Sequence, residues 1–126
     1  CFTFLSPMKD YDRDRNFKIL IDALSLLGVD AMAKGRNDIV VDGQKISGSA
    51  YKYITDRALH HGTMLVDVDT AMLGKVLNPS KAKLQSKGVT SVQQRVLNLK
   101  TKFPEINHNT LCDAIKQRFF HTYSDT

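Results

Sequence analysis

Residues 35–50 read GRNDIVVDGQKISGSA and contain the strongest structural signal in this sequence. Ile39–Val41 are β-branched, which predicts a strand. Asp42 and Gly43 follow directly and predict a two-residue hairpin turn, because such a turn needs backbone conformations with positive φ. Residues 44–50 then predict the returning strand, so this stretch is expected to form an antiparallel hairpin.

Polar and very small residues surround this turn. Asn37 and Asp38 begin the first strand and Lys45 lies on the second, so their side chains are expected close together. An ammonium there would offset the repulsion between a carboxylate substrate and a phosphate, and an Asp carboxylate suits Mg²⁺. The same residues also have ordinary explanations. Lys45 could be an exposed strand lysine, and Asn37 and Asp38 could be turn-capping residues. The residues after Ile46 leave the backbone accessible to a ligand: Ser47, Gly48, Ser49 and Ala50.

Composition bounds the function. The chain has 126 residues, 42% of them hydrophobic, with a net charge of +5. Residues 70–104 contain no Asp or Glu but seven Lys or Arg, which favours an anionic partner or a solvated surface. No aromatic residue lies between Tyr53 and Phe103, which disfavours base stacking and nucleic-acid binding.

No run approaches the ~20 apolar residues of a membrane helix, so no membrane association is expected. The chain contains only two cysteines, Cys1 and Cys112. Such low cysteine usage fits a reducing compartment, either the cytoplasm or alternatively the mitochondrial matrix.

Apolar periodicity predicts the remaining elements. Strands are expected at residues 1–5, 30–34 and 56–66, the last broken by His60 and His61. Helices are expected at 13–27 with Asp12 or Asp14 as the cap, after Asp69, at 91–99 and after the cap Asn107, with a loop over 81–90. Because strands cluster early and helices late, the fold class is α+β, with a mainly antiparallel sheet and flanking helices.

Three motifs resemble the lipoate–protein ligase and lipoyltransferase family, in order and over nearly the whole chain. They are residues 35–50, residues 57–65 (RALHHGTML) and residues 86–99 (SKGVTSVQQRVLNL). The Asn-Asp pair and the downstream lysine are also similar to those of biotin–protein ligases. The resemblance implies the catalytic-domain fold of these ligases. It further implies that residues 1–126 are the second part of that domain, without its upstream arginine- and glycine-rich motif and without the small C-terminal accessory domain.

The resemblance implies a chemistry and a set of site residues. Lipoate and ATP, with Mg²⁺, would form lipoyl-adenylate, and the lipoyl group would pass to a lysine of an acceptor protein. The implied acceptors are the lipoyl domains of 2-oxoacid dehydrogenase complexes and the H protein of glycine cleavage. Lys45 would contact the acyl-adenylate as the catalytic residue, Asn37 and Asp38 would bind nucleotide, and Asp38 is our candidate metal ligand. The remaining candidate binding residues are Ser47, Gly48, Ser49, Ala50, His61, Lys87 and Arg95, and a loop over 78–90 would fold over the adenylate.

Several alternatives stay open at this point. A relative could transfer a preformed adenylate or use octanoate, and a non-catalytic fragment could act as a binding module. Successive strand residues face opposite sides, so only one of His60 and His61 can face a site, and a hydrogen-bonded core histidine is the alternative for either. Cys112 lies on the apolar side of a predicted helix, which argues against a cysteine-dependent acyltransferase.

Overall fold

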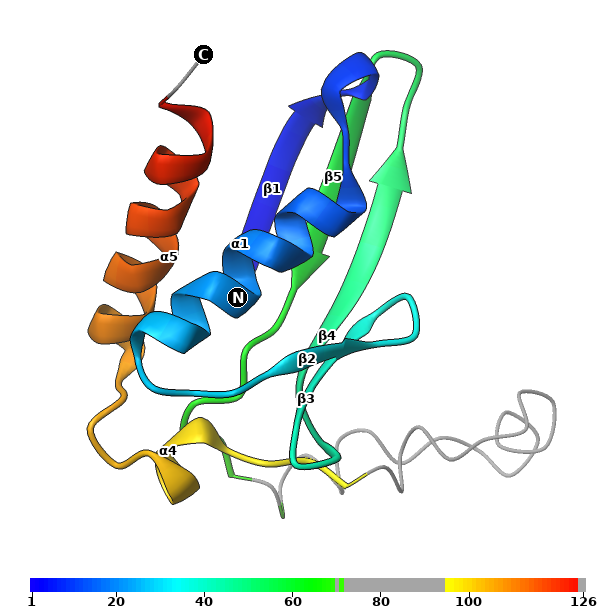
Figure 1. Ribbon diagram of the computed structural model, residues 1–126. Coiled ribbons are helices and arrows are strands. Elements are labelled where there is room, and N and C mark those ends of the chain that lie inside the picture. The colour runs from blue at the N-terminus through cyan, green and yellow to red at the C-terminus, as the bar shows by residue number, and fades with distance from the viewer. Residues whose placement is uncertain (70, 72–94, 125–126) are drawn as a thin grey trace, which may run out of the picture.

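The computed structural model of this chain describes residues 1–69, 71 and 95–124. It contains one five-stranded antiparallel sheet in the order β1-β5-β4-β3-β2 (Figure 1). The strands are β1 (Phe2–Pro7), β2 (Met32–Lys34), β3 (Asp38–Val41), β4 (Gln44–Tyr53) and β5 (Arg57–Gly62). The helices are η1 (Met8–Asp10), α1 (Arg13–Leu26), α4 (Leu99–Lys102) and α5 (His108–Tyr123). The predicted α+β class with an antiparallel sheet and flanking helices is therefore confirmed.

Both long helices begin at side-chain caps that the sequence indicates. The Asp12 carboxylate accepts a hydrogen bond from the backbone N–H of Arg15 at the start of α1. At α5, Asn107 and Thr110 satisfy each other's backbone N–H groups in a capping box. These caps fix the helix starts, which the apolar periodicity alone would leave uncertain by several residues.

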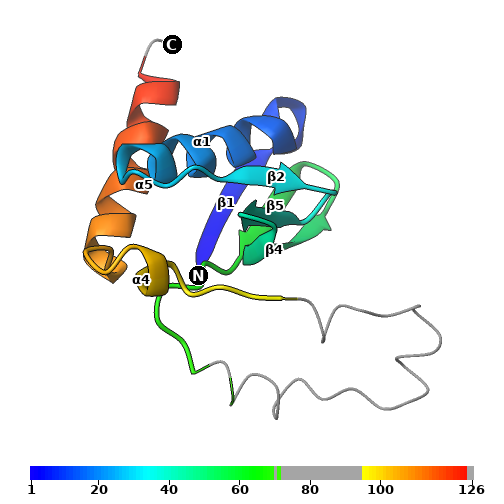
Figure 2. The same ribbon diagram turned by 60° about the horizontal axis from the view of Figure 1, so that its bottom comes forward.

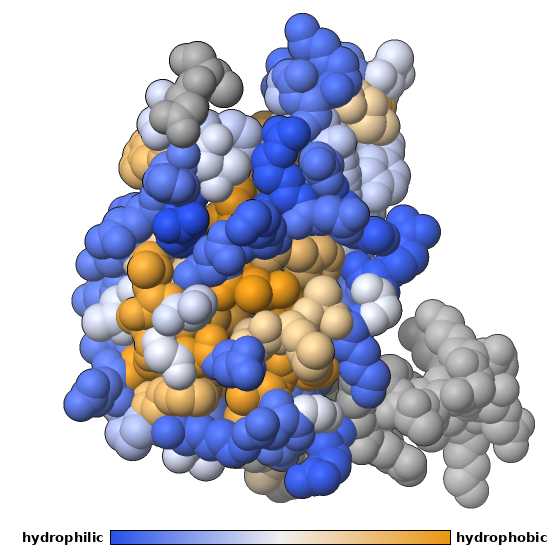
Figure 3. All heavy atoms as spheres, in the orientation of Figure 1, coloured by the Kyte–Doolittle hydropathy of each residue, from blue (hydrophilic) through white to orange (hydrophobic). Residues whose placement is uncertain are grey.

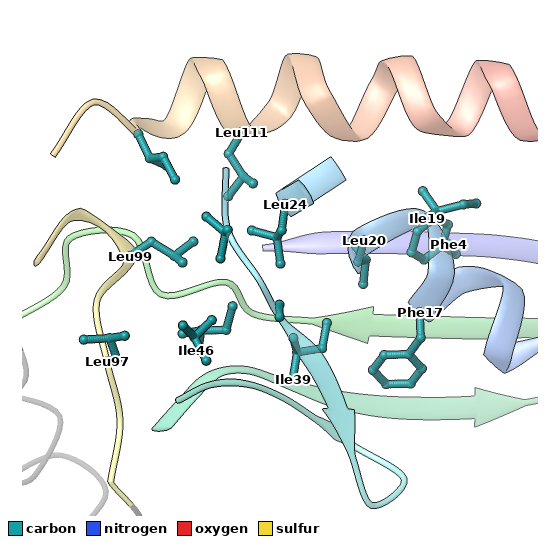
Figure 4. Close-up of a cluster of buried hydrophobic side chains, with 14 residues drawn as sticks. Phe4, Phe17, Ile19, Leu20, Leu24, Ile39, Ile46, Leu97, Leu99 and Leu111 are labelled. Atoms are coloured by element: carbon teal, nitrogen blue, oxygen red, sulfur yellow. The ribbon is translucent and has the colours of Figure 1, made fainter. Parts of the chain in front are cut away.

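The core lies between one face of the sheet and the helices. Figures 1 and 2 place α1 and α5 on the same side of the sheet. Leu20 and Leu24 of α1 are fully buried, as are Ile39 of β3 and Ile46 of β4 (Figure 4). Figure 3 shows apolar surface around the C-terminal half of α1, ringed by hydrophilic residues. In the described part of the chain, none of the helices is both long and apolar enough to cross a membrane.

Two predictions about β5 and its surroundings are wrong. The strand is continuous through His60 and His61, because both residues pair with β1 on one side and β4 on the other. It also ends at Gly62, before the expected residue 66, although the following segment still contacts β4. Thr63 N–H donates to the Gly48 carbonyl at 2.9 Å, and Leu65 N–H donates to the Ile46 carbonyl at 2.8 Å.

The predicted helix over 91–99 is wrong for its described part. Val96 instead forms a parallel bridge with Lys45 in β4. The Lys45 N–H donates to the Arg95 carbonyl, and the Leu97 N–H donates to the Lys45 carbonyl, each at 2.9 Å. Pairing with a strand distant in sequence thus overrides the local helical pattern, and only Leu99–Lys102 are helical. Residues 72–94, which include the predicted loop over 81–90 and most of the helix expected after Asp69, lie outside the described residues.

Candidate functional site

The sheet presents two chemically different faces. We call one the His60 face, defined by the side chains of Ile39, Ser47, Ser49 and His60, which lie toward α1. We call the other the Lys45 face, defined by Asp38, Lys45, Gly48, Ala50 and His61. The assignment follows from the strand register, in which Asp38 lies opposite Gly48 and Ala50 lies opposite His61.

A one-residue bulge places Lys45 on this face. Ile39 pairs with Ser47 and the next residue, Val40, pairs with Lys45, so Ile46 is an extra residue in β4. In a regular strand, Lys45 and Gly48 are three residues apart and would point to opposite faces. The bulge turns Ile46 into the core and brings Lys45 onto the same face as Asp38 and Gly48.

Lys45 and Asp38 form a partly buried ion pair. The Lys45 Nζ lies 3.2 Å from Asp38 Oδ1, and the two side chains are 26% and 19% exposed. Partial burial reduces the screening of this pair by water, so its charges are felt more strongly than those of an exposed pair. The predicted proximity of Asp38 and Lys45 is therefore present in the structure.

Residues 95–97, which follow the undescribed residues, are hydrogen-bonded to the backbone of Lys45. Both backbone groups of Lys45 are hydrogen-bonded to Arg95 and Leu97, as given above. Arg95, one of the candidate binding residues, is thus next to Lys45 through its backbone, and the residue is exposed. Lys87 lies outside the described residues. Asn37 is exposed in the turn before β3, one residue from Asp38.

His61 and Thr63 extend the Lys45 face toward β1. His61 Nδ1 lies 2.8 Å from Thr3 Oγ1, and both residues are exposed. Thr63 follows β5 on the same side, and its Oγ1 accepts a hydrogen bond from the Gly48 N–H at 3.3 Å. The sequence reasoning did not select Thr63, although its position two residues after His61 is the signal that could have found it.

The four small residues of β4 divide between the two faces. Gly48 and Ala50 lie on the Lys45 face, whereas Ser47 and Ser49 direct their side chains to the His60 face. Ser49 Oγ is hydrogen-bonded to His60, and Ser47 is fully buried. Ser47 and Ser49 could therefore contribute only backbone groups to a ligand on the Lys45 face.

His60 is a core histidine in a polar and aromatic environment. Asn16 Nδ2 donates to its Nδ1 at 3.3 Å, so Nε2 carries the proton and donates to Ser49 Oγ at 2.9 Å. The rings of Phe17 and Tyr51 lie 5.3 and 4.7 Å from its ring. Burial, with smaller contributions from Arg13 and His61, lowers the pKa of His60 from 6.5 to about 4. The imidazole is therefore neutral near pH 7.

The donor set around Asp38 fits a metal only together with a substrate. Among the described residues, no group of three or more His, Cys, Asp or Glu side chains could hold a metal ion. Mg²⁺ commonly takes one or two carboxylates and completes its shell with substrate phosphates and water. One partly buried carboxylate beside an exposed Asn37 amide fits that pattern.

Comparisons with known proteins agree on one family. The family model for the lipoyl protein ligase A/B catalytic domain matches residues 1–120. A lipoate-protein ligase A of Psychrobacter cryohalolentis is 53% identical over 125 residues, which are 99% of this chain and 37% of that relative. The crystal structure of P. falciparum LipL1 in complex with lipoate has a TM-score of 0.78 at 33% identity, covering 98% of this chain and 34% of that one.

A second solved structure gives the same result. It is a bipartite lipoate protein ligase of Thermoplasma acidophilum, described with its E2 lipoyl domain. Its TM-score is 0.77 at 25% identity, and the match covers 95% of this chain and 49% of that chain. This chain therefore belongs to the lipoyl protein ligase A/B catalytic domain family.

Proposed function

We propose that the protein containing these residues activates lipoate with ATP and attaches the lipoyl group to an acceptor protein. The observation that carries this proposal is the partly buried Lys45–Asp38 pair against Gly48, in a chain 53% identical to a lipoate-protein ligase A. The chain spans 37% of that relative, so the activity is assigned to the whole protein.

The reaction has two balanced steps. A lipoate carboxylate oxygen attacks the α-phosphorus of ATP, a P–O bond forms, and the bond to the β-phosphate oxygen breaks to release pyrophosphate. The ε-amine of the acceptor lysine then attacks the acyl carbon, loses a proton and forms an amide, while AMP leaves.

Lys45 would act in the first step. Its ammonium would lie between two anions, the carboxylate and the α-phosphate, and would stabilise the negative charge that develops at phosphorus. Asp38 and Asn37 would hold the nucleotide together with Mg²⁺, which would supply further neutralisation of phosphate charge. Ala50 and the backbone of residues 47–49 would border the adenylate, and His61 would line the acyl chain.

The acceptors we propose are lipoyl domains of 2-oxoacid dehydrogenase complexes and the glycine-cleavage H protein. The description of the T. acidophilum ligase with its E2 lipoyl domain supports an acceptor of this kind. Seven basic residues without an acidic residue over 70–104 would favour an acidic acceptor surface. Such acceptors place the reaction in the cytoplasm or, alternatively, the mitochondrial matrix.

We further propose that residues 1–126 form one part of the catalytic domain. The edge strand β1 and helix α5 border a groove of about 590 Å³ that includes Leu5, Phe119 and Phe120. Leu5 and Phe120 are 63% and 67% exposed, which is unusual for apolar residues of this size on one surface. The rest of the catalytic domain would cover this groove, so residues 1–126 alone should be inactive and should regain adenylate formation when the remaining part is supplied.

A lipoate-dependent exchange of labelled pyrophosphate into ATP tests the proposal with the intact protein. We expect exchange that requires lipoate, followed by AMP release when an acceptor lipoyl domain is added. Transfer from synthetic lipoyl-adenylate without any exchange would instead identify a transferase. Octanoate in place of lipoate tests the acyl-chain preference. Absence of both exchange and transfer would contradict the enzymatic assignment.

A further inference from the structure

We infer that Gly48 is a positioning residue for the Lys45 ammonium, and that its missing side chain is what lets Lys45 lie against β4 beside Asp38. This inference rests on the proposed function for its meaning in catalysis. Its structural part concerns only residues of this chain and is testable without substrate.

The space above Gly48 is occupied by Lys45. A Cβ built on Gly48 would lie 3.1 Å from both Cε and Nζ of Lys45. The next neighbour, Thr63 Oγ1, would be at 4.0 Å, which is an ordinary contact. An alanine at this position therefore requires the end of Lys45, and none of its other neighbours, to shift by a few tenths of an ångström.

Backbone conformation does not explain a glycine at this position. The described glycines with positive φ are Gly28, Gly35 and Gly43, and Gly48 is not among them. Alanine thus fits the local backbone, and replacing a strand glycine by alanine reduces the entropy of the unfolded chain. The glycine costs stability and leaves room for the ammonium.

Gly62, on the adjacent strand β5, provides the contrasting case. A Cβ there would lie 2.7 Å from the Gly48 carbonyl oxygen and would also overlap the Phe2 ring. Backbone cannot yield as the end of a lysine side chain can, so a side chain at Gly62 would strain the pairing of β4 and β5. Alanine at Gly48 should therefore shift Lys45 without destabilising the fold, whereas alanine at Gly62 should destabilise it.

The first test measures Lys45 itself in the intact protein without substrate. An acetylating N-hydroxysuccinimide ester labels lysines, and peptide mass spectrometry gives the Lys45 rate relative to exposed Lys52 on the same strand. We expect Gly48→Ala to raise the relative rate about threefold, the change that corresponds to losing a partly exposed ion pair. The melting temperature should be unchanged or higher, whereas Gly62→Ala should lower it. An unchanged Lys45 rate in Gly48→Ala would overturn the inference.

The second test is a double-mutant cycle on adenylate formation. Gly48→Ala alone should lower the rate roughly tenfold, because a small misplacement of a reacting group is costly. In the Lys45→Ala background, the same substitution should change the residual rate by less than about twofold, since there is no ammonium left to displace. Equal losses in both backgrounds would show that Gly48 acts on the ligand or the fold, and would overturn the inference. Absence of adenylate formation in the unmodified protein would contradict the proposed function, while the labelling experiment would still decide the role of Gly48.

Discussion

His60 and His61 are adjacent in β5 and lie on opposite faces of the sheet. His60 is 1% exposed, is hydrogen-bonded to Asn16 and Ser49, and lies among aromatic rings. His61 is exposed and shares a hydrogen bond with Thr3 across to β1. The pleat of one strand thus separates a structural histidine from one available to a ligand, and a histidine pair in the sequence says nothing about function until its faces are assigned.

The same division holds for the whole sheet. Polar groups on the His60 face, apart from Ser47, are paired with one another and enclosed by α1. On the Lys45 face, Asp38 and Lys45 keep part of their surface exposed. We therefore expect substitutions on the His60 face to reduce stability and substitutions on the Lys45 face to reduce catalysis.

The largest stability effect should come from His60. His60→Ala removes a buried ring and leaves the Asn16 and Ser49 side chains without their partner, which should cost about 3–5 kcal/mol of unfolding free energy. His61→Ala should cost less than about 0.5 kcal/mol, as expected for an exposed residue. Denaturant unfolding of the intact protein measures both, and equal losses would contradict the division between the faces.

The titration of His60 should make stability depend on pH. Its pKa is about 4 in the folded protein and 6.5 in the absence of burial, so between these values the unfolded chain binds a proton that the folded protein does not. Stability should therefore fall as pH decreases from about 6.5 to 4. At pH 5 the loss from this group is about 2 kcal/mol relative to pH 7. The difference between the unmodified protein and His60→Gln isolates this contribution, and parallel pH curves for the two would contradict it.

Asp38 should affect nucleotide binding more than folding. Asp38→Asn keeps the size of the side chain and removes the charge, so we expect the KM for ATP to rise about tenfold, the value of one interaction with a charged group. Asp42→Asn is the matched control, because Asp42 lies in the hairpin turn of the same β3–β4 unit and pairs with Lys102. Steady-state kinetics at varied ATP distinguishes them. A similar KM in both variants would remove Asp38 from the site.

A small effect should come from the Lys102–Asp42 pair. This ion pair joins α4 to the hairpin, and the two side chains are 37% and 74% exposed. Lys102→Ala should reduce the unfolding free energy by less than about 1 kcal/mol, because solvent screens exposed pairs. A loss above about 2 kcal/mol would show that exposure is a poor guide to the strength of ion pairs in this fold.

The sequence predicted the elements whose signals are local. The Asp42-Gly43 turn, the Asp12 and Asn107 caps and the helical spacing of α1 are all present, because each depends on residues within one or two turns. The error at residues 95–98 has a different origin. Their extended conformation depends on backbone pairing with Lys45, about fifty residues away, which no local pattern encodes.

The proximity of the candidate residues Asp38 and Lys45 was predicted better than the face of the sheet that each candidate occupies. The hairpin correctly brought Asp38 and Lys45 together, because the turn fixes the pairing of the strands. The bulge at Ile46 has no recognisable sequence signal, yet it decides which face Lys45 occupies. Strand alternation alone is enough to separate Gly48 and Ala50 from Ser47 and Ser49, and to select Thr63 two residues after His61.

A matched pair of lysines on β4 tests the central claim most directly. Lys45 and Lys52 lie on the same strand, and Lys52 is exposed opposite Leu59, away from Asp38. We measure adenylate formation and thermal unfolding for Lys45→Ala and Lys52→Ala in the intact protein. Lys45→Ala should lower the rate on the order of 10²–10³-fold, the cost of removing one transition-state donor, with the melting temperature unchanged. Lys52→Ala should keep the full rate. If Lys45→Ala retained more than about a tenth of the rate, the Lys45 face would not be the place where lipoate is activated.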